Sequence, residues 1–127
     1  MIMSRVALRL VVIAAAGCTH GSSAPMPSVG DESTIAAGDS LYHRVGCDRC
    51  HGVDAEGTLR GGSLRTNNWK VNNGSLDDLI RVISAGVPAS ALHDRTRSEG
   101  MPPRGGAAIT TEQIRQLAAF VYAISRR

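Results

Sequence analysis

The chain is most constrained at residues 47–51, where Cys47 and Cys50 are separated by two residues and His51 follows at once. Each thiol in this spacing can form a thioether to one vinyl group of a porphyrin, and the imidazole can bind the central metal from the proximal side. The pattern is typical of covalent haem attachment. A chain that carries such a group must pack short segments around a large, flat, apolar body.

Two other uses of the cysteine pair have less support in the sequence. Thiol redox chemistry of the thioredoxin type needs a βαβ context around the pair, and no strand pattern precedes Cys47. A structural zinc site needs four well-separated ligands. Cys47, Cys50 and His51 are too crowded to serve together, and the sequence contains no second Cys-x-x-Cys pair.

The first 17 residues have the features of a bacterial export signal. Arg5 and Arg9 form a positive start, and residues 10–17 form an apolar run that ends in small residues. A helix that spans a bilayer needs about 20 apolar residues, so this run predicts a signal peptide rather than a membrane anchor. The signal places the following chain outside the cytoplasm, on the periplasmic side of a membrane.

The third cysteine, Cys18, directly follows the small residues Ala15-Ala16-Gly17. This run resembles the lipobox of bacterial lipoproteins, which implies an acylated Cys18 as the new N-terminus and a membrane tether. Ordinary cleavage near Ala24, with Cys18 discarded, is the alternative. Thr19 after the cysteine slightly favours sorting to the outer membrane. Residues 18–32 are rich in Gly, Ser and Pro and predict a flexible linker.

Residues 33–127 predict a single, all-α domain with three to five short helices. A helix is expected from Ser33 or Thr34 toward Val45, and another between Ser75 and Gly86. The last helix is best marked, because Thr110 and Gln113 form a capping box before an apolar stripe. Because the sequence holds only one tryptophan, two tyrosines and one phenylalanine, a bound cofactor would strengthen so small a core.

Met101 is the expected ligand on the distal side of the iron. It stands in a loop between Gly100 and Pro102-Pro103, and the fixed φ of proline stiffens the backbone there. His93, in the loop before it, is the alternative ligand. Trp69 needs a partner for its indole N–H when buried, and either a haem propionate or ordinary packing fits.

The net charge does not indicate a nucleic-acid partner. The formal value is +3, from 14 basic and 11 acidic residues, and Arg5 and Arg9 belong to the export signal. No basic run with interleaved aromatic residues appears, so nucleic-acid binding is not expected.

Taken together, these residues resemble a bacterial mono-haem class I cytochrome c of the lipoprotein type. The resemblance covers roughly residues 34–127. Trp69 and the stretch from Gly74 to Pro88 are most similar to cytochrome subunits that serve terminal oxidases. The resemblance implies an all-α fold around one covalent haem c, with Gly38 and Tyr42 of the first helix meeting Phe120 or Tyr122 of the last. Where the family often has Pro-x-Leu, the sequence has Gly62-Ser63-Leu64, whose Gly62 carbonyl can still accept from the His51 ring.

The expected function is electron transfer rather than catalysis. With Cys47 and Cys50 as thioethers, and His51 and Met101 on the iron, no position is open for a substrate. The chain would carry single electrons from a quinol-oxidising complex or dehydrogenase to a terminal oxidase or reductase, as a free carrier or as a subunit. A haem-based ligand sensor or peroxidase is the alternative, and it requires a labile distal ligand.

Overall fold

The computed structural model describes residues 28–93 and 99–127, and within them it is helical. Its elements are α1 (Glu32–Arg44), α2 (Asp48–His51), α3 (Leu76–Ala85), two short 3₁₀ turns, η1 (Ala89–Ala91) and η2 (Pro103–Gly106), and α4 (Thr111–Ile124). The described residues form no strand beyond an isolated bridge between Val87 and Met101. The all-α prediction is therefore confirmed.

Some predictions fall on residues outside this description. The signal peptide at residues 1–17, Cys18 and the linker as far as residue 27 are among them. Within residues 28–93 and 99–127, no helix has the length and apolar character needed to cross a membrane.

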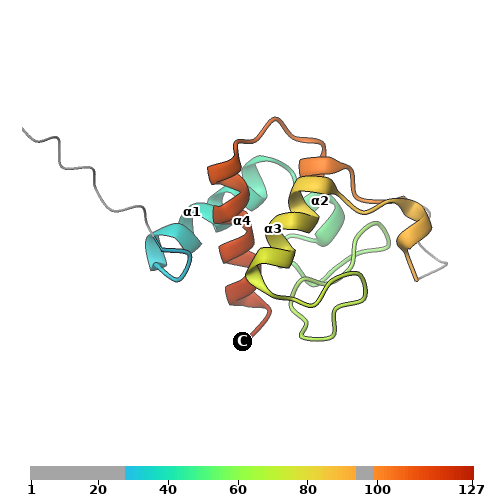
Figure 1. Ribbon diagram of the computed structural model, residues 1–127, viewed down its shortest axis with the longest axis horizontal. Coiled ribbons are helices and arrows are strands. Elements are labelled where there is room, and N and C mark those ends of the chain that lie inside the picture. The colour runs from blue at the N-terminus through green and yellow to red at the C-terminus, as the bar shows by residue number, and fades with distance from the viewer. Residues whose placement is uncertain (1–27, 94–98) are drawn as a thin grey trace, which may run out of the picture.

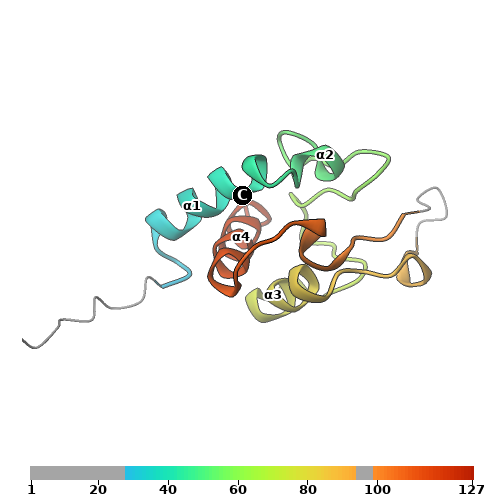
Figure 2. The same cartoon turned by 90° about the horizontal axis from the view of Figure 1, so that it is seen from above.

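Helices α1 and α4 form the frame of the domain and cross in close contact (Figures 1 and 2). A Cβ atom placed on Gly38 would lie only 2.1 Å from the Gln116 carbonyl oxygen, so a glycine is required there. One turn further, the rings of Tyr42 and Phe120 lie 5.5 Å apart between centroids. The expected meeting of Gly38 and Tyr42 with Phe120 is confirmed, whereas Tyr122 is 37% exposed on another side of α4.

The capping residues of α3 and α4 act as the sequence predicted. Thr110 and Gln113 form both hydrogen bonds of a capping box at the start of α4. Ser75 accepts a hydrogen bond from the Asp78 amide, and α3 ends at Ala85 before Gly86. The start of α1 was placed wrongly, because Asp31 rather than Ser33 or Thr34 is the N-cap residue. The Asp31 carboxylate accepts hydrogen bonds from Ser28 and does not cap the helix.

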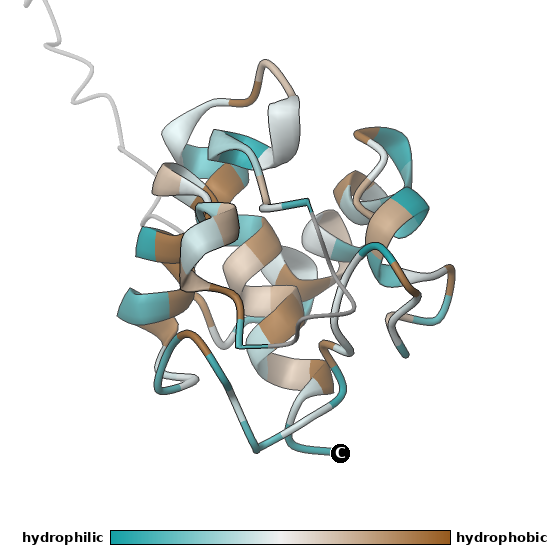
Figure 3. Ribbon diagram, turned by 90° about the vertical axis from the view of Figure 1, so that its right-hand side faces the viewer, coloured by the Kyte–Doolittle hydropathy of each residue, from teal (hydrophilic) through white to brown (hydrophobic). Residues whose placement is uncertain are grey.

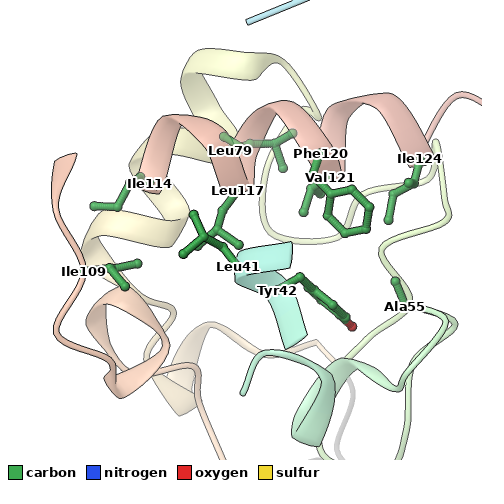
Figure 4. Packing of buried hydrophobic residues seen from close by; sticks show 11 residues of the cluster. Leu41, Tyr42, Ala55, Leu79, Ile109, Ile114, Leu117, Phe120, Val121 and Ile124 are labelled. Carbon is green, nitrogen blue, oxygen red and sulfur yellow. The ribbon is translucent and has the colours of Figure 1, made fainter. Parts of the chain in front are cut away.

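The core lies where α4 meets α1 and α3. Leu41 and Leu117 meet at its centre, beside Tyr42 (Figure 4). Hydrophobic and hydrophilic residues alternate along the helices, as expected when each helix buries one side (Figure 3). The predicted stripe on α4 is buried as expected, at Ile114, Leu117, Val121 and Ile124. This frame supports the loops that enclose the candidate site.

Candidate haem-binding site

Helix α2 presents both cysteines of the sequence motif. Cys47 is its N-cap residue and Cys50 lies one turn later, so the two thiols lie on one side of the helix. Both are free thiols and partly buried. Gly46 and Gly52 flank the helix with φ of +84° each, a conformation that favours glycine. The short helix is therefore closed by a turn at each end, with the thiols at the spacing that haem attachment needs.

The His51 ring is oriented by a backbone carbonyl of the following loop. Its Nδ1 donates to the Gly62 carbonyl oxygen at 2.8 Å. This contact assigns the proton to Nδ1, and makes Nε2 the nitrogen through which the ring would bind a metal. The sequence prediction that Gly62 could replace the usual proline at this place is confirmed. An oriented, hydrogen-bonded imidazole of this kind is the usual arrangement of a metal ligand.

The loop of residues 52–64 folds back onto the motif helix. The Thr58 hydroxyl donates to the Cys50 carbonyl at 2.6 Å, and the Gly57 amide donates to the His51 carbonyl at 2.8 Å. A Cβ on Gly61 would lie 2.7 Å from the Cys50 carbonyl oxygen. The glycines thus let the loop approach the motif helix closely, and the Thr58 hydroxyl holds it there.

Met101 is held by its backbone rather than by its side chain. Its amide donates to the Val87 carbonyl at 2.8 Å, and the Val87 amide donates to the Met101 carbonyl at 2.7 Å. A Cβ on Gly86 would lie 2.3 Å from the Met101 carbonyl oxygen, and a Cβ on Gly100 would lie 2.3 Å from that of Val87. Two glycines are therefore needed for this bridge to close.

The sequence also contains a pattern that favours this bridge between Val87 and Met101. Both Val87 and Met101 stand between a glycine and a proline. A residue before proline is driven into an extended conformation, and a glycine before it permits close approach of another backbone. Two such Gly-x-Pro triplets favour an extended pair, but only the fold brings them together.

One cavity of about 390 Å³ brings the predicted site residues together. Cys47, Cys50, His51 and Met101 all line it. Much of its remaining wall is apolar and includes Leu64, Leu79, Val82, Ile83, Leu117 and Val121. Trp69 and His93 also line it, so the structure leaves His93 within the same site as Met101.

Tyr42 joins the helical frame to the motif. Its hydroxyl donates to the Gly52 carbonyl at 2.6 Å, and its ring lines the cavity. Burial, with the nearby Cys47 and Asp48, raises the Tyr42 pKa well above its usual range, so the hydroxyl stays protonated and keeps donating. Burial also raises the pKa of the Cys47 thiol before haem is attached, and the Asp48 carboxylate adds to this effect.

These residues fit a covalently bound haem. Two thiols on one helical side, an oriented imidazole and a thioether share a cavity with a largely apolar wall. Among the described residues, no three His, Cys, Asp or Glu side chains are grouped as ligands for a bare metal ion. With haem bound in this cavity, the protein would supply the thioether bonds through Cys47 and Cys50.

Comparisons with known proteins agree with this fit. Residues 33–121 match the family model described as cytochrome c oxidase, cbb3-type, subunit III. The chain is 33% identical over 92 residues to the cbb3-type cytochrome c oxidase subunit FixP of Sinorhizobium medicae (strain WSM419), covering 72% of this chain and 30% of that protein. It is 30% identical over 95 residues to the subunit CcoP of Rubrivivax gelatinosus, covering 75% of this chain and 27% of that protein.

A solved structure is similar as well. Cytochrome cL from the marine methylotroph Methylophaga aminisulfidivorans superimposes with a TM-score of 0.57 at 29% identity, over 73% of this chain and 54% of that one. The chain spans less than a third of the length of these curated relatives, so the likeness covers only part of each. From the match over residues 33–121 and the site geometry, the chain belongs to the family of cbb3-type cytochrome c oxidase subunit III, and is a class I, electron-carrying cytochrome with covalently bound haem c.

Proposed function

We propose that this chain carries single electrons between redox partners on the periplasmic side of a bacterial membrane, with His51 and Met101 as the axial ligands. The observation that carries the proposal is the shared cavity, which contains Cys47, Cys50, His51 and Met101 together. When bound, haem c supplies a one-electron Fe(III)/Fe(II) couple.

The protein's contribution on the proximal side is an oriented ring. The hydrogen bond from Nδ1 of His51 to the Gly62 carbonyl fixes the tautomer and increases the basicity of Nε2. The attachment of Cys47 and Cys50 on the same short helix limits movement of His51 relative to the porphyrin. This arrangement favours a ligand that stays in place in both oxidation states.

The protein's contribution on the distal side is a thioether on a stiff backbone. The bridge between Met101 and Val87 fixes the main chain, and Pro102 follows it directly. A Met/His pair raises the reduction potential relative to stronger donors. With both axial positions filled by the protein, substrates and diatomic ligands are excluded.

Replacement of Met101 tests this assignment. Met101→Ala should lose the absorption band of the iron–sulfur bond and lower the midpoint potential, as measured by spectroelectrochemistry. Met26→Leu, in the predicted linker, is the matched control and should change neither property. The assignment is wrong if Met101→Ala keeps both the band and the potential.

His93 provides a second arm of the same experiment, because it lines the same cavity. If His93 replaces a missing Met101, the Met101→Ala protein will stay six-coordinate and low-spin, whereas Met101→Ala/His93→Ala will become high-spin.

The alternative function, a ligand sensor or peroxidase, requires an open distal position instead. Carbon monoxide binding by the reduced wild-type protein at neutral pH would favour that function, and its absence favours the electron carrier.

The proposed setting is a membrane surface reached through a lipid on Cys18. A lipobox-like run precedes Cys18, and residues 18–32 have the composition of a flexible tether. Cys18→Ser should move the cytochrome from the membrane fraction to the soluble periplasmic fraction, with an unchanged haem spectrum. Retention of the variant in the membrane would exclude the lipid as the anchor.

The proposed electron donor is a quinol-oxidising complex or a dehydrogenase, and the proposed acceptor is a terminal oxidase or reductase. The relatives named as cbb3-type oxidase subunits support a terminal oxidase on the acceptor side. Oxidation of the reduced cytochrome by membranes that contain or lack such an oxidase would test this pairing.

A further inference from the structure

Trp69, in the wall of the haem cavity, rests on a glycine of the following loop. A Cβ placed on Gly74 would lie 2.2 Å from the Trp69 indole nitrogen and 2.3 Å from the neighbouring ring carbon. Gly74 also has a φ of +72°, in the region that favours glycine. The edge of the indole therefore packs directly on the Gly74 backbone, and its position depends on where that backbone lies.

The Gly74 backbone is held in turn by Arg126, which lies two residues after the end of α4. The Arg126 guanidinium donates from Nη2 to the Gly74 carbonyl at 3.1 Å, across 52 residues of sequence. Nearby bonds give the loop its local shape, because the Gly74 amide donates to Asn72 Oδ1 and the Ser75 amide donates to Asn73 Oδ1, each at 2.8 Å. These local bonds stay within the loop, whereas the Arg126 contact joins the Gly74 carbonyl directly to the segment that follows α4.

The guanidinium of Arg126 is itself oriented before it reaches the loop. It lies over the Tyr122 ring, 3.5 Å from the centroid. Its Nη1 donates to the Tyr122 carbonyl at 3.2 Å and to the Ser125 hydroxyl at 3.0 Å. Because the planar guanidinium is already held on one side, its other nitrogen can donate to the loop with little further loss of side-chain entropy. The pair Tyr122 and Arg126 thus forms a rigid arm.

We propose that Arg126 is a positioning residue for the haem environment, acting through Gly74 on Trp69. It touches neither the cavity ligands nor the cysteines, and it does not line the haem cavity. The proposal deepens the proposed electron-transfer function and rests on it, because the property that Arg126 adjusts is the potential of that couple. Nothing in the attachment motif would identify such a residue.

The expected consequence follows from solvent access. Without the contact, the Gly74 carbonyl loses its bond to the segment that follows α4, and the backbone under the indole can shift and let the indole leave the cavity wall. Water then reaches the haem more easily and favours the more highly charged Fe(III) state, which lowers the potential. A hydrogen bond from a charged donor is strong enough to shift the balance between packed and displaced indole by about tenfold.

The test uses the haem-loaded full chain and two readouts. Because Trp69 is the single tryptophan, its fluorescence reports its distance from the haem, which quenches the emission by energy transfer. Arg126→Gln should raise the fluorescence yield and lower the midpoint potential. Arg127→Gln removes the same charge from the exposed neighbouring residue and should change neither. Arg126→Lys, which keeps the charge and one donor, should lie between wild type and Arg126→Gln.

A second variant distinguishes the proposed role of Arg126 from a general loss of folding. Gly74→Ala displaces the indole directly while the Arg126 side chain stays unchanged, so it should change both readouts in the same direction as Arg126→Gln. The proposal is overturned if Arg126→Gln leaves fluorescence and potential unchanged, or if Arg127→Gln changes them equally. It is also overturned if Arg126→Gln lowers only the unfolding temperature. The same redox titration tests the proposed function separately. A wild-type protein without a reversible one-electron couple would contradict that function rather than the role of Arg126.

Discussion

The two sides of the haem cavity hold their proposed iron ligands by different means. On the proximal side, His51 is fixed by a hydrogen bond from its own ring to the Gly62 carbonyl. On the distal side, the fixed group is the main chain of Met101, which is bridged to Val87 by two hydrogen bonds. The position of the Met101 thioether therefore depends on the position of that backbone.

This difference predicts different sensitivities to substitution. The proximal ligand has three supports, namely its ring hydrogen bond and the two neighbouring cysteines. The distal ligand depends on a backbone bridge that two close glycine contacts permit. Replacement of a glycine on the distal side should therefore remove Met101 from the iron. Replacement of a glycine on the proximal side should only shift His51 slightly.

The largest effect is expected for Gly86→Ala. The new methyl group would meet the Met101 carbonyl at 2.3 Å, and the residue has a φ of +74°. Overpacking and left-handed strain together should cost about 2 to 5 kcal/mol of stability. The bridge should open, and the reduced protein should bind carbon monoxide at the position that Met101 leaves.

Gly105→Ala is the matched control for that experiment. Gly105 has a φ of +63° in the same region of the chain, but no atom lies within 4 Å of its added Cβ. This variant should show only the strain, about 1 to 2 kcal/mol, and should not bind carbon monoxide. Equal behaviour of the two variants would show that strain rather than the bridge controls Met101.

A smaller effect is expected for Gly61→Ala on the proximal side. Its Cβ would lie 2.7 Å from the Cys50 carbonyl oxygen and 3.1 Å from His51 Nδ1. We expect a loss of about 1 to 3 kcal/mol in unfolding free energy, and a change in potential with both axial ligands kept. Gly30→Ala, where no atom lies within 4 Å, is the control. Loss of His51 from the iron, seen by magnetic circular dichroism, would contradict the comparison.

The smallest effect on stability is expected at Asp78, which holds the loop before α3 through the Asn73 amide. Its carboxylate accepts from the Asn73 amide and from Arg81, and these contacts hold its pKa below the usual range. A lowered carboxyl pKa stabilises the fold above the unfolded-state pKa, near 4, and this stability is lost as the pH falls through the folded value. Asp78→Asn should therefore be less stable than wild type at neutral pH.

Thermal unfolding over a range of pH checks this expectation. The difference in unfolding temperature between wild type and Asp78→Asn should shrink as the pH falls below about 4, where an ordinary aspartate is protonated. A difference that does not change with pH would show that the charge of Asp78 plays no part.

Much of the fold could be predicted because its signals are local. The capping box and the apolar stripe of α4, and the Ser75 cap of α3, are patterns of residues close together in the sequence. The N-cap of α1 lies two or three residues before the predicted one, because Asp31, Ser33 and Thr34 are all good caps by type. Only the structure shows that Asp31 occupies the N-cap position.

The candidate site was predicted less evenly. The contiguous motif at Cys47, Cys50 and His51 identified the haem, whereas the Gly62 carbonyl as acceptor for the His51 ring came from the family resemblance. The hydroxyl of Thr58 and the partnership of Val87 with Met101 were missed. Both depend on a loop returning to a distant segment, and no local pattern determines where a loop returns.

The contact between Gly38 and Gln116 has a consequence for the order of folding. It joins segments near opposite ends of the domain, so it forms only after a long loop has closed, which is slow and entropically costly. Before that, α2 is a segment of four residues that is too short to be helical alone. We therefore expect both thiols to stay accessible in an open chain until the last helix docks. Haem attachment is expected to precede that docking, and the porphyrin then becomes part of the nucleus around which the frame closes.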